Sequence, residues 1–201
     1  MKKYKKRYLI LLLLFFVCLP ANANCSAHWA QFLKQPDKKA LVVLEKSIAV
    51  QAQRCNWGDP SNLAVAPTEK QDLQLFHLIS TGNRPAFQAA LLVHKCWDGG
   101  ELEDFYISAG IFFEKQSLVF LQLVKKNAIT YAEIESMLTM LPLDTTDDID
   151  RQIFVVKNRI KILKEIGDES LSEIKIKGLS FLEKEKDNLY KTAEELKKNR
   201  Q

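Results

Sequence analysis

The spacing of the apolar residues is the feature that most limits what this chain can fold into. From residue 26 to the C-terminus, apolar residues recur at intervals of three and four, which places them on one face of an α-helix. A half-buried β-strand needs alternation at every second residue, and no segment shows that pattern convincingly. Proline, glycine and helix-capping residues interrupt the pattern at short intervals. We therefore predict an all-α chain of about nine helices.

Two short patterns mark the starts of predicted helices. Thr68 with Gln71, and Thr130 with Glu133, have the S/T-x-x-E/Q spacing of a capping box. In a capping box each of the two side chains binds the backbone amide of the other residue, which satisfies donors that the first turn of a helix leaves unpaired. We expect a helix to begin directly after each threonine.

The predicted helices are joined by short connections, which make neighbouring helices antiparallel. Residues 69–97 and 101–127 each resemble a helical hairpin, and the two are weakly similar at a spacing of about 33 residues. This similarity favours stacked antiparallel hairpins, a solenoid-like arrangement, over an up-down bundle. Gly110 lies inside a helix that is apolar nearly all round, which indicates a close helix crossing. We expect one all-helical domain over residues 24–201, ending in a charged helix at 183–201 that can fray.

The N-terminus has the pattern of a secretory signal peptide. Residues 2–7 are mostly basic, residues 8–19 are apolar, and Ala21 and Ala23 supply the small residues that signal peptidase recognises. The apolar run is shorter than the roughly 18 residues that a membrane span needs, and we expect no later segment to qualify. The sequence therefore predicts cleavage after Ala23, export to a bacterial periplasm, and no transmembrane anchor after residues 1–23 are removed.

Removal of the signal peptide changes the charge of the chain. The full sequence has 29 basic and 25 acidic residues, a net charge of +4. The signal peptide carries five of the basic residues and no acidic residue, so the mature chain has a net charge of −1. Binding to nucleic acid depends on a basic surface, and we therefore expect no nucleic acid partner.

Three cysteines remain after cleavage, because Cys18 leaves with the signal peptide. An oxidising compartment favours one disulfide among Cys25, Cys55 and Cys96. Cys55 and Cys96 are each predicted at the C-terminal end of a helix, and these two helices alternate in the chain. Antiparallel packing would bring both cysteines to the same end of the stack. We predict a Cys55–Cys96 disulfide, with Cys25–Cys55 as the alternative.

The stretch between the two predicted hairpins contains the adjacent glycines Gly99 and Gly100. We interpret the stretch as a turn, in which one helix ends at Trp97 and the glycines give the backbone the freedom to reverse. Asp98 with Glu101 has the spacing of a capping box for the helix that follows.

A second interpretation makes the same stretch a metal or ligand site built from His94, Asp98, Glu101 and Asp104. His94 and Asp98 are four residues apart, so one face of a helix can carry both. Cations need several convergent oxygen or nitrogen ligands. Acids in the first turn of a helix are common, however, because they interact favourably with the helix dipole. We favour the turn and assign no metal ligand and no cofactor.

The sequence carries no motif of a hydrolase, a phosphate-binding loop or a dinucleotide site. We assign no catalytic residue and expect a noncatalytic helical module that binds another protein of the envelope or a secreted protein. Exported helical immunity proteins and envelope assembly factors are analogous in fold alone. The candidate contact residues are Trp57, Trp97, Glu101, Glu103 and Asp104.

Two other hypotheses remain open. A periplasmic hydrolase or metal-binding enzyme could use His94 together with the acidic turn Asp98–Asp104, because the members of a catalytic set need not be neighbours in sequence. A structural component of the envelope could instead dock through the charged final helix.

Overall fold

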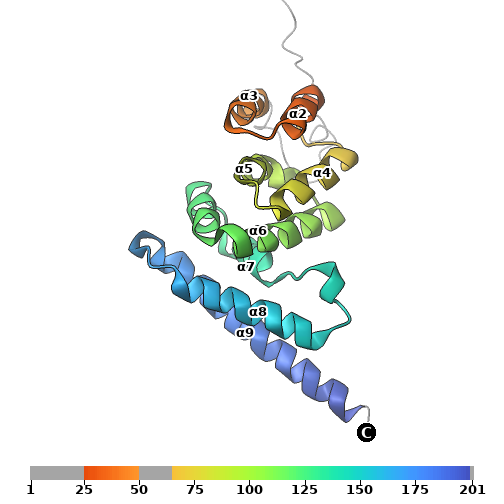
Figure 1. The fold of residues 1–201 in the computed structure, drawn as a ribbon, viewed down its shortest axis with the longest axis vertical. Helices are drawn as coiled ribbons and strands as arrows, with labels where there is room; N and C mark the ends of the chain where they lie inside the picture. Colours follow the sequence, from red (N-terminus) through yellow and green to blue (C-terminus); the bar gives the residue numbers. More distant parts are fainter. Residues whose placement is uncertain (1–24, 50–64, 200–201) are drawn as a thin grey trace, which may run out of the picture.

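The computed structural model describes residues 25–49 and 65–199, and every regular element in these two ranges is helical (Figure 1). The α-helices are α2 (Cys25–Lys34), α3 (Lys38–Ala49), α4 (Glu69–Ser80), α5 (Arg84–Val93), α6 (Gly99–Lys126), α7 (Tyr131–Thr139), α8 (Ile149–Glu165) and α9 (Ser172–Lys198). Short 3₁₀ segments are η3 (His94–Cys96), η4 (Leu143–Thr145) and η5 (Glu169–Leu171). The prediction of an all-α fold is confirmed. The predicted signal peptide, residues 1–23, lies outside the described residues.

The helices lie in successive layers along the long axis of the molecule (Figure 1). At one end α2 packs on α3, and these two helices contact α4 and α5 respectively. Next, α4 and α5 both pack on α6, which in turn packs on α7 and α8. At the other end α8 and α9 lie side by side, and α9 also contacts α7.

The predicted helix starts at Thr68 and Thr130 are confirmed. Thr130 and Glu133 form both hydrogen bonds of the capping box at the start of α7. At the start of α4 the Thr68 amide donates to Oε1 of Gln71 at 3.0 Å, whereas the Thr68 side chain makes no capping hydrogen bond. Asp98 does occupy the N-cap position of α6, but its side chain makes no capping hydrogen bond. The capping box predicted at this third position is therefore absent.

Eight α-helices are present in the described residues, rather than about nine, because two predicted helices are joined in α6. The junction is a kink at Gln116, whose φ of −140° and ψ of 45° are not helical. Joined in this way, α6 is long and apolar enough to cross a membrane, so the expectation that no segment after the signal peptide qualifies is corrected. In this fold half of its most apolar window is buried against the other helices.

Aromatic side chains fill the core between α5 and α6. The ring of Phe87, on α5, stacks against Phe112 at a centroid distance of 4.5 Å and against Phe120 at 5.5 Å. Phe105 lies 6.2 Å from the same ring. Because Phe112 and Phe120 lie on opposite sides of the kink at Gln116, Phe87 holds both halves of α6 in one core.

A buried arginine joins α6, α7 and α8. Arg159, on α8, is fully buried, and its Nε donates a hydrogen bond of 2.8 Å to Oε1 of Glu114 on α6. Its Nη1 donates to the carbonyl oxygens of Leu138 and Met140 at the C-terminal end of α7, each at 2.8 Å. These two carbonyls lie where a helix leaves its last acceptors without a partner within the helix, so Arg159 caps α7 from the side.

The guanidinium can reach this position because Gly110 has no side chain. A Cβ atom at Gly110 would lie 2.7 Å from Nη2 and 2.9 Å from Nη1 of Arg159, and 2.8 Å from the carbonyl oxygen of Met137. The close approach predicted at Gly110 is therefore present, although a side chain of α8 and the backbone of α7 make it.

The charged segment at the C-terminus is helical as far as Lys198. Its apolar residues Leu189 and Ala193 are buried in the core cluster, and α9 packs along α8. Nearer the start of α9, Gly178 allows the helix to approach the side chains of Leu138 and Leu163. A Cβ atom at Gly178 would lie 3.0 Å from a methyl carbon of each leucine.

Replacing Gly110 by alanine should destabilise the protein by about 1 to 3 kcal/mol, because the added methyl group overlaps the guanidinium and a backbone carbonyl. Urea unfolding followed by circular dichroism measures the loss. Gly100→Ala, on the same helix with no atom within 4 Å of the added Cβ, is the matched control and should cost little. Equal stability of the two variants would contradict this account of Gly110.

Candidate functional site

The candidate site is the turn between α5 and α6. The last turn of α5 tightens into the 3₁₀ segment η3, and Trp97 follows in an extended conformation. Helix α6 then begins at Gly99, whose φ of +45° is one that glycine adopts without strain. The interpretation of this stretch as a turn between two helices therefore agrees with the geometry.

Trp97 belongs to the core rather than to the surface. Its ring lies 5.2 Å from that of Phe76, edge to face, and 5.3 Å from that of Phe105. Its Nε1 donates a hydrogen bond of 3.0 Å to Oδ1 of Asp72 on α4. Although Trp97 was a candidate contact residue, only 3% of it is exposed, so it is not available to a partner in this conformation.

Asp72 is a buried acid that the sequence analysis did not identify. Burial raises the pKa of its carboxyl to about 7, the charges of Glu101 and Glu69 act in the same direction, and the hydrogen bond from Trp97 opposes them. Helical spacing could have identified it, since Asp72 lies three, four and seven residues before buried apolar positions of α4.

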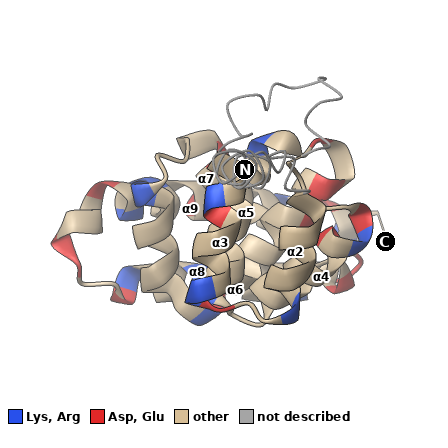
Figure 2. Cartoon of the chain, turned by 90° about the horizontal axis from the view of Figure 1, so that it is seen from above, with Lys and Arg blue, Asp and Glu red and all other residues tan. Residues whose placement is uncertain are grey.

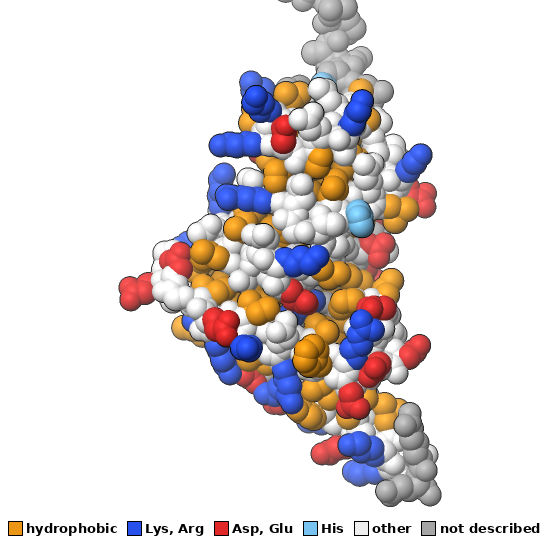
Figure 3. Space-filling view, in the orientation of Figure 1, with side chains coloured by type: hydrophobic (Ala, Val, Ile, Leu, Met, Phe, Trp, Pro, Cys, Tyr) orange, Lys and Arg blue, Asp and Glu red, His pale blue; other side chains and the backbone are white. Residues whose placement is uncertain are grey.

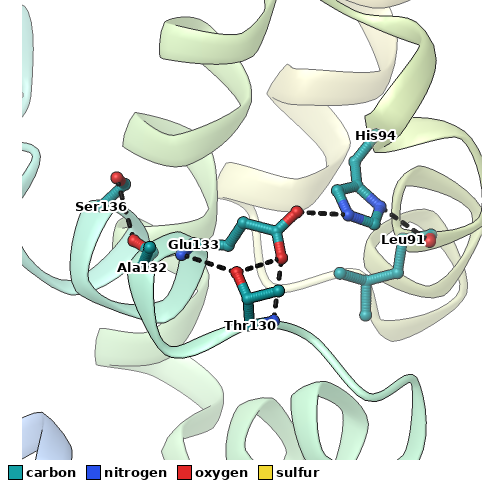
Figure 4. Close-up of polar contacts among 6 residues, drawn as sticks. All are labelled: Leu91, His94, Thr130, Ala132, Glu133 and Ser136. Atoms are coloured by element: carbon teal, nitrogen blue, oxygen red, sulfur yellow. Dashed lines mark hydrogen bonds and ion pairs between the residues drawn. The ribbon is translucent and has the colours of Figure 1, made fainter. Parts of the chain in front are cut away.

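His94 is also buried, and its ring faces α7 (Figure 4). Its Nε2 lies 2.9 Å from Oε1 of Glu133, and its Nδ1 lies 3.0 Å from the carbonyl oxygen of Leu91. The other carboxylate oxygen of Glu133 accepts hydrogen bonds from the amide and the hydroxyl of Thr130, at 2.8 and 2.6 Å. One carboxylate therefore serves both the capping box of α7 and the contact with His94.

The surroundings of Glu133 keep its carboxylate ionised. Burial acts to raise the pKa of Glu133, but the hydrogen bonds from Thr130 and the charge and hydrogen bond of His94 outweigh burial and lower the pKa below its ordinary value. Burial raises the pKa of the Tyr106 hydroxyl on α6, and the negative charge of Glu133 adds to this increase.

The four candidate metal ligands are not brought together. His94 faces Glu133, whereas Asp98 and Glu101 are exposed and Asp104 is half-buried. Within residues 25–49 and 65–199, no group of three or more His, Cys, Asp or Glu side chains could hold a metal ion. The acids at the start of α6 therefore form an exposed edge, to which Glu103 also belongs.

Two candidate features fall on residues that the structure does not describe. Trp57, proposed as a contact residue, lies outside the described ranges. Cys55 does too, so both the Cys55–Cys96 disulfide and its alternative, Cys25–Cys55, stay predictions.

A hollow of about 180 Å³ lies where the end of α6 and the start of α7 meet α9. Its polar side chains are already engaged with their neighbours. Lys125 donates a hydrogen bond of 2.6 Å to the carbonyl oxygen of Ser170, and the hydroxyl of Tyr131 donates one of 2.5 Å to Glu173. The hollow therefore does not present the convergent unpaired groups that a small-molecule site needs.

No protein-family model, no curated protein and no solved structure matches the chain. A proposal about function therefore rests on the geometry described above.

Asp72→Asn should reduce the pH dependence of stability. The folded pKa of Asp72, about 7, lies above the ordinary 3.8, so the folded state retains a proton that the unfolded chain gives up. Stability therefore falls as the pH rises through this window, and the loss is complete above pH 7. Asparagine does not ionise. The free energy of unfolding of Asp72→Asn should therefore exceed that of the wild type at pH 8 by on the order of 2 to 4 kcal/mol, and the two should be about equal near pH 4.

Urea unfolding at pH 4, 6 and 8 measures these differences. Asp98→Asn, at an exposed position in the same turn, is the control and should follow the wild type. If Asp72→Asn keeps the pH dependence of the wild type, the described environment of Asp72 is wrong.

Proposed function

We propose that this protein is a noncatalytic module that binds another protein outside the cytoplasm, in a bacterial periplasm, after residues 1–23 are removed. We also propose that its layers are stacked antiparallel hairpins, a short solenoid. The contacts of α2 with α4, and of α4 and α5 with α6, support this arrangement. Stacked helical pairs expose extended surfaces, which suit recognition of a protein better than of a small molecule.

The observation that carries the proposal is a set of large apolar side chains exposed at the end formed by η4, α8 and α9. Leu143 is 72% exposed, Phe154 69% and Ile176 66%. Figure 3 shows hydrophobic side chains at the surface among charged ones over this part of the molecule. Large exposed apolar side chains such as these are candidates for contact with another protein.

The polar interior also favours binding over catalysis. His94, Asp72 and Arg159 make hydrogen bonds to groups of this chain. Nη2 of Arg159 has no hydrogen-bond partner, but the side chain is fully buried and therefore out of reach of a substrate. An enzyme needs a nucleophile or base placed in a cavity together with the group that orients it. The geometry of His94, which faces Glu133 rather than the acidic turn, gives no support to the alternative of a hydrolase or metal enzyme.

The charge distribution favours a protein partner as well. Figure 2 shows acidic and basic residues intermixed along the helices. A nucleic acid partner calls for a continuous basic surface. Of the acidic contact candidates, Glu101 and Glu103 are exposed at the start of α6 and remain available to a partner.

The test is crosslinking of the exported, tagged protein in living cells, followed by quantitative mass spectrometry of what it captures. We expect one protein to be recovered with the wild type and reduced about fivefold or more by Phe154→Ser or Ile176→Ser. Leu73→Ser is the matched control, because Leu73 is 62% exposed but lies on α4, in another layer. This variant should capture the partner as the wild type does.

Two outcomes would contradict the proposal. Equal recovery of every captured protein by the wild type and all three variants would mean that the exposed apolar side chains contact no partner. Failure of the wild type to enrich any protein would remove the case for a binding module.

A further inference from the structure

Both nitrogen atoms of the His94 ring face groups that can only accept a hydrogen bond. The carbonyl oxygen of Leu91 lies 3.0 Å from Nδ1, and Oε1 of Glu133 lies 2.9 Å from Nε2. A neutral imidazole carries one N–H, so it can donate to one of these oxygens while its second nitrogen directs a lone pair at the other. Both hydrogen bonds form together only when each nitrogen carries a proton.

We propose that His94 is held as an imidazolium in the folded protein, and that its ion pair with Glu133 is a pH-sensitive latch that joins η3 to α7. The two residues are 39 positions apart in the chain, so the latch connects segments that no local contact would hold together. The proposal does not depend on the function proposed above.

The latch weakens when His94 loses a proton, because the neutral ring can donate to only one of its two acceptors. The Thr130 amide and hydroxyl both donate to Oε2 of Glu133, which stabilises the ionised carboxylate. Histidine is the side chain that ordinarily changes charge between about pH 5 and 8. Loss of the imidazolium proton removes the ion pair with Glu133 and one of the two hydrogen bonds of the ring.

Asp72 lies on the other side of the same aromatic cluster and acts in the same direction. His94 is 6.3 Å from the ring of Phe105, and Trp97, which donates to Asp72, is 5.3 Å from it. As the pH rises, His94 loses its positive charge while Asp72 gains a negative charge facing Glu69 and Glu101. Both changes weaken the segment between α5 and α6.

The charged and titratable groups that face these two residues come from three helices. Glu133 on α7 faces His94, and the charge of Glu133 also acts on Tyr106 of α6. Glu69 on α4 and Glu101 on α6 face Asp72. No lysine or arginine is among them, so no cation replaces the charge that His94 gives up.

The direct test is the protonation state of the ring, measured by long-range ¹H–¹⁵N NMR of the three histidine side chains. His94→Gln and His77→Gln assign the signals. We expect both nitrogens of His94 to be protonated at pH 5.5 and the ring to lose a proton as the pH is raised to 8.5. The signal of His77, which is exposed, serves as the internal comparison. A His94 ring that is neutral at pH 5.5 would overturn the proposal.

Hydrogen exchange of the backbone amides tests whether the pair acts as a latch. After correction for intrinsic rates, residues 94–104 should exchange about tenfold faster or more at pH 8 than at pH 5.5. In Glu133→Gln the pH response of this segment should be smaller than in the wild type, because the carboxylate that pairs with the imidazolium is gone while Asp72 still ionises. Glutamine can still accept from the Thr130 amide, as Gln71 does from the Thr68 amide in α4, so the helix start is preserved.

His77→Gln is the matched control and should show the same pH response as the wild type. The latch is contradicted if residues 94–104 of the wild type exchange equally at pH 5.5 and 8. It is also contradicted if Glu133→Gln retains the pH response of the wild type.

Discussion

The lower layers of the molecule depend on one buried cation, the guanidinium of Arg159. Burial lowers its pKa and the charge of Glu114 opposes this shift, so the group stays charged inside the protein. A buried charge is tolerated when it is paired and hydrogen-bonded, and here the carboxylate of Glu114 and two carbonyl oxygens of α7 meet it. The arrangement also requires Gly110, because any side chain there would occupy the position of the guanidinium. One residue of α8 thus fixes where α6 and α7 lie.

The upper layers are joined by the same kind of contact. The Nε1 of Trp29, on α2, donates to the carbonyl oxygen of Val65, and that of Trp97 donates to Asp72. His94 and Glu133 connect the end of α5 to α7. Apolar packing alone tolerates sliding and repacking, whereas a buried polar pair has a narrow range of acceptable geometries. These pairs therefore explain a stack with defined layers and an interior whose polar groups are used for structure.

The sequence predicted the helices and the turn between the hairpins because their causes are local. The capping box of Glu133 could be predicted from a residue three positions away, but its bond to His94 spans 39 positions and leaves no local pattern. In the same way Gly110 indicated a close approach, while its partner Arg159 on another helix could not be identified. The two helices predicted within residues 101–127 are joined at the kink of Gln116, because hydrophobic spacing does not show whether hydrogen bonding continues across such a point. The sequence therefore predicts helices and the capping contacts between residues close in the chain. Which residues far apart in the chain come into contact is decided by tertiary packing.

The central claim is that buried polar contacts hold these layers together, and the free energy of unfolding of Arg159→Met tests it most directly. Methionine replaces the unbranched stem of the side chain but leaves Glu114 and the α7 carbonyls without their donor. We predict a loss of about 3 kcal/mol or more, because removing one member of a buried ion pair leaves the other uncompensated. Arg151→Met, which breaks an exposed pair with Asp144, should cost no more than about 1 kcal/mol. A loss for Arg159→Met as small as that for Arg151→Met would contradict the claim.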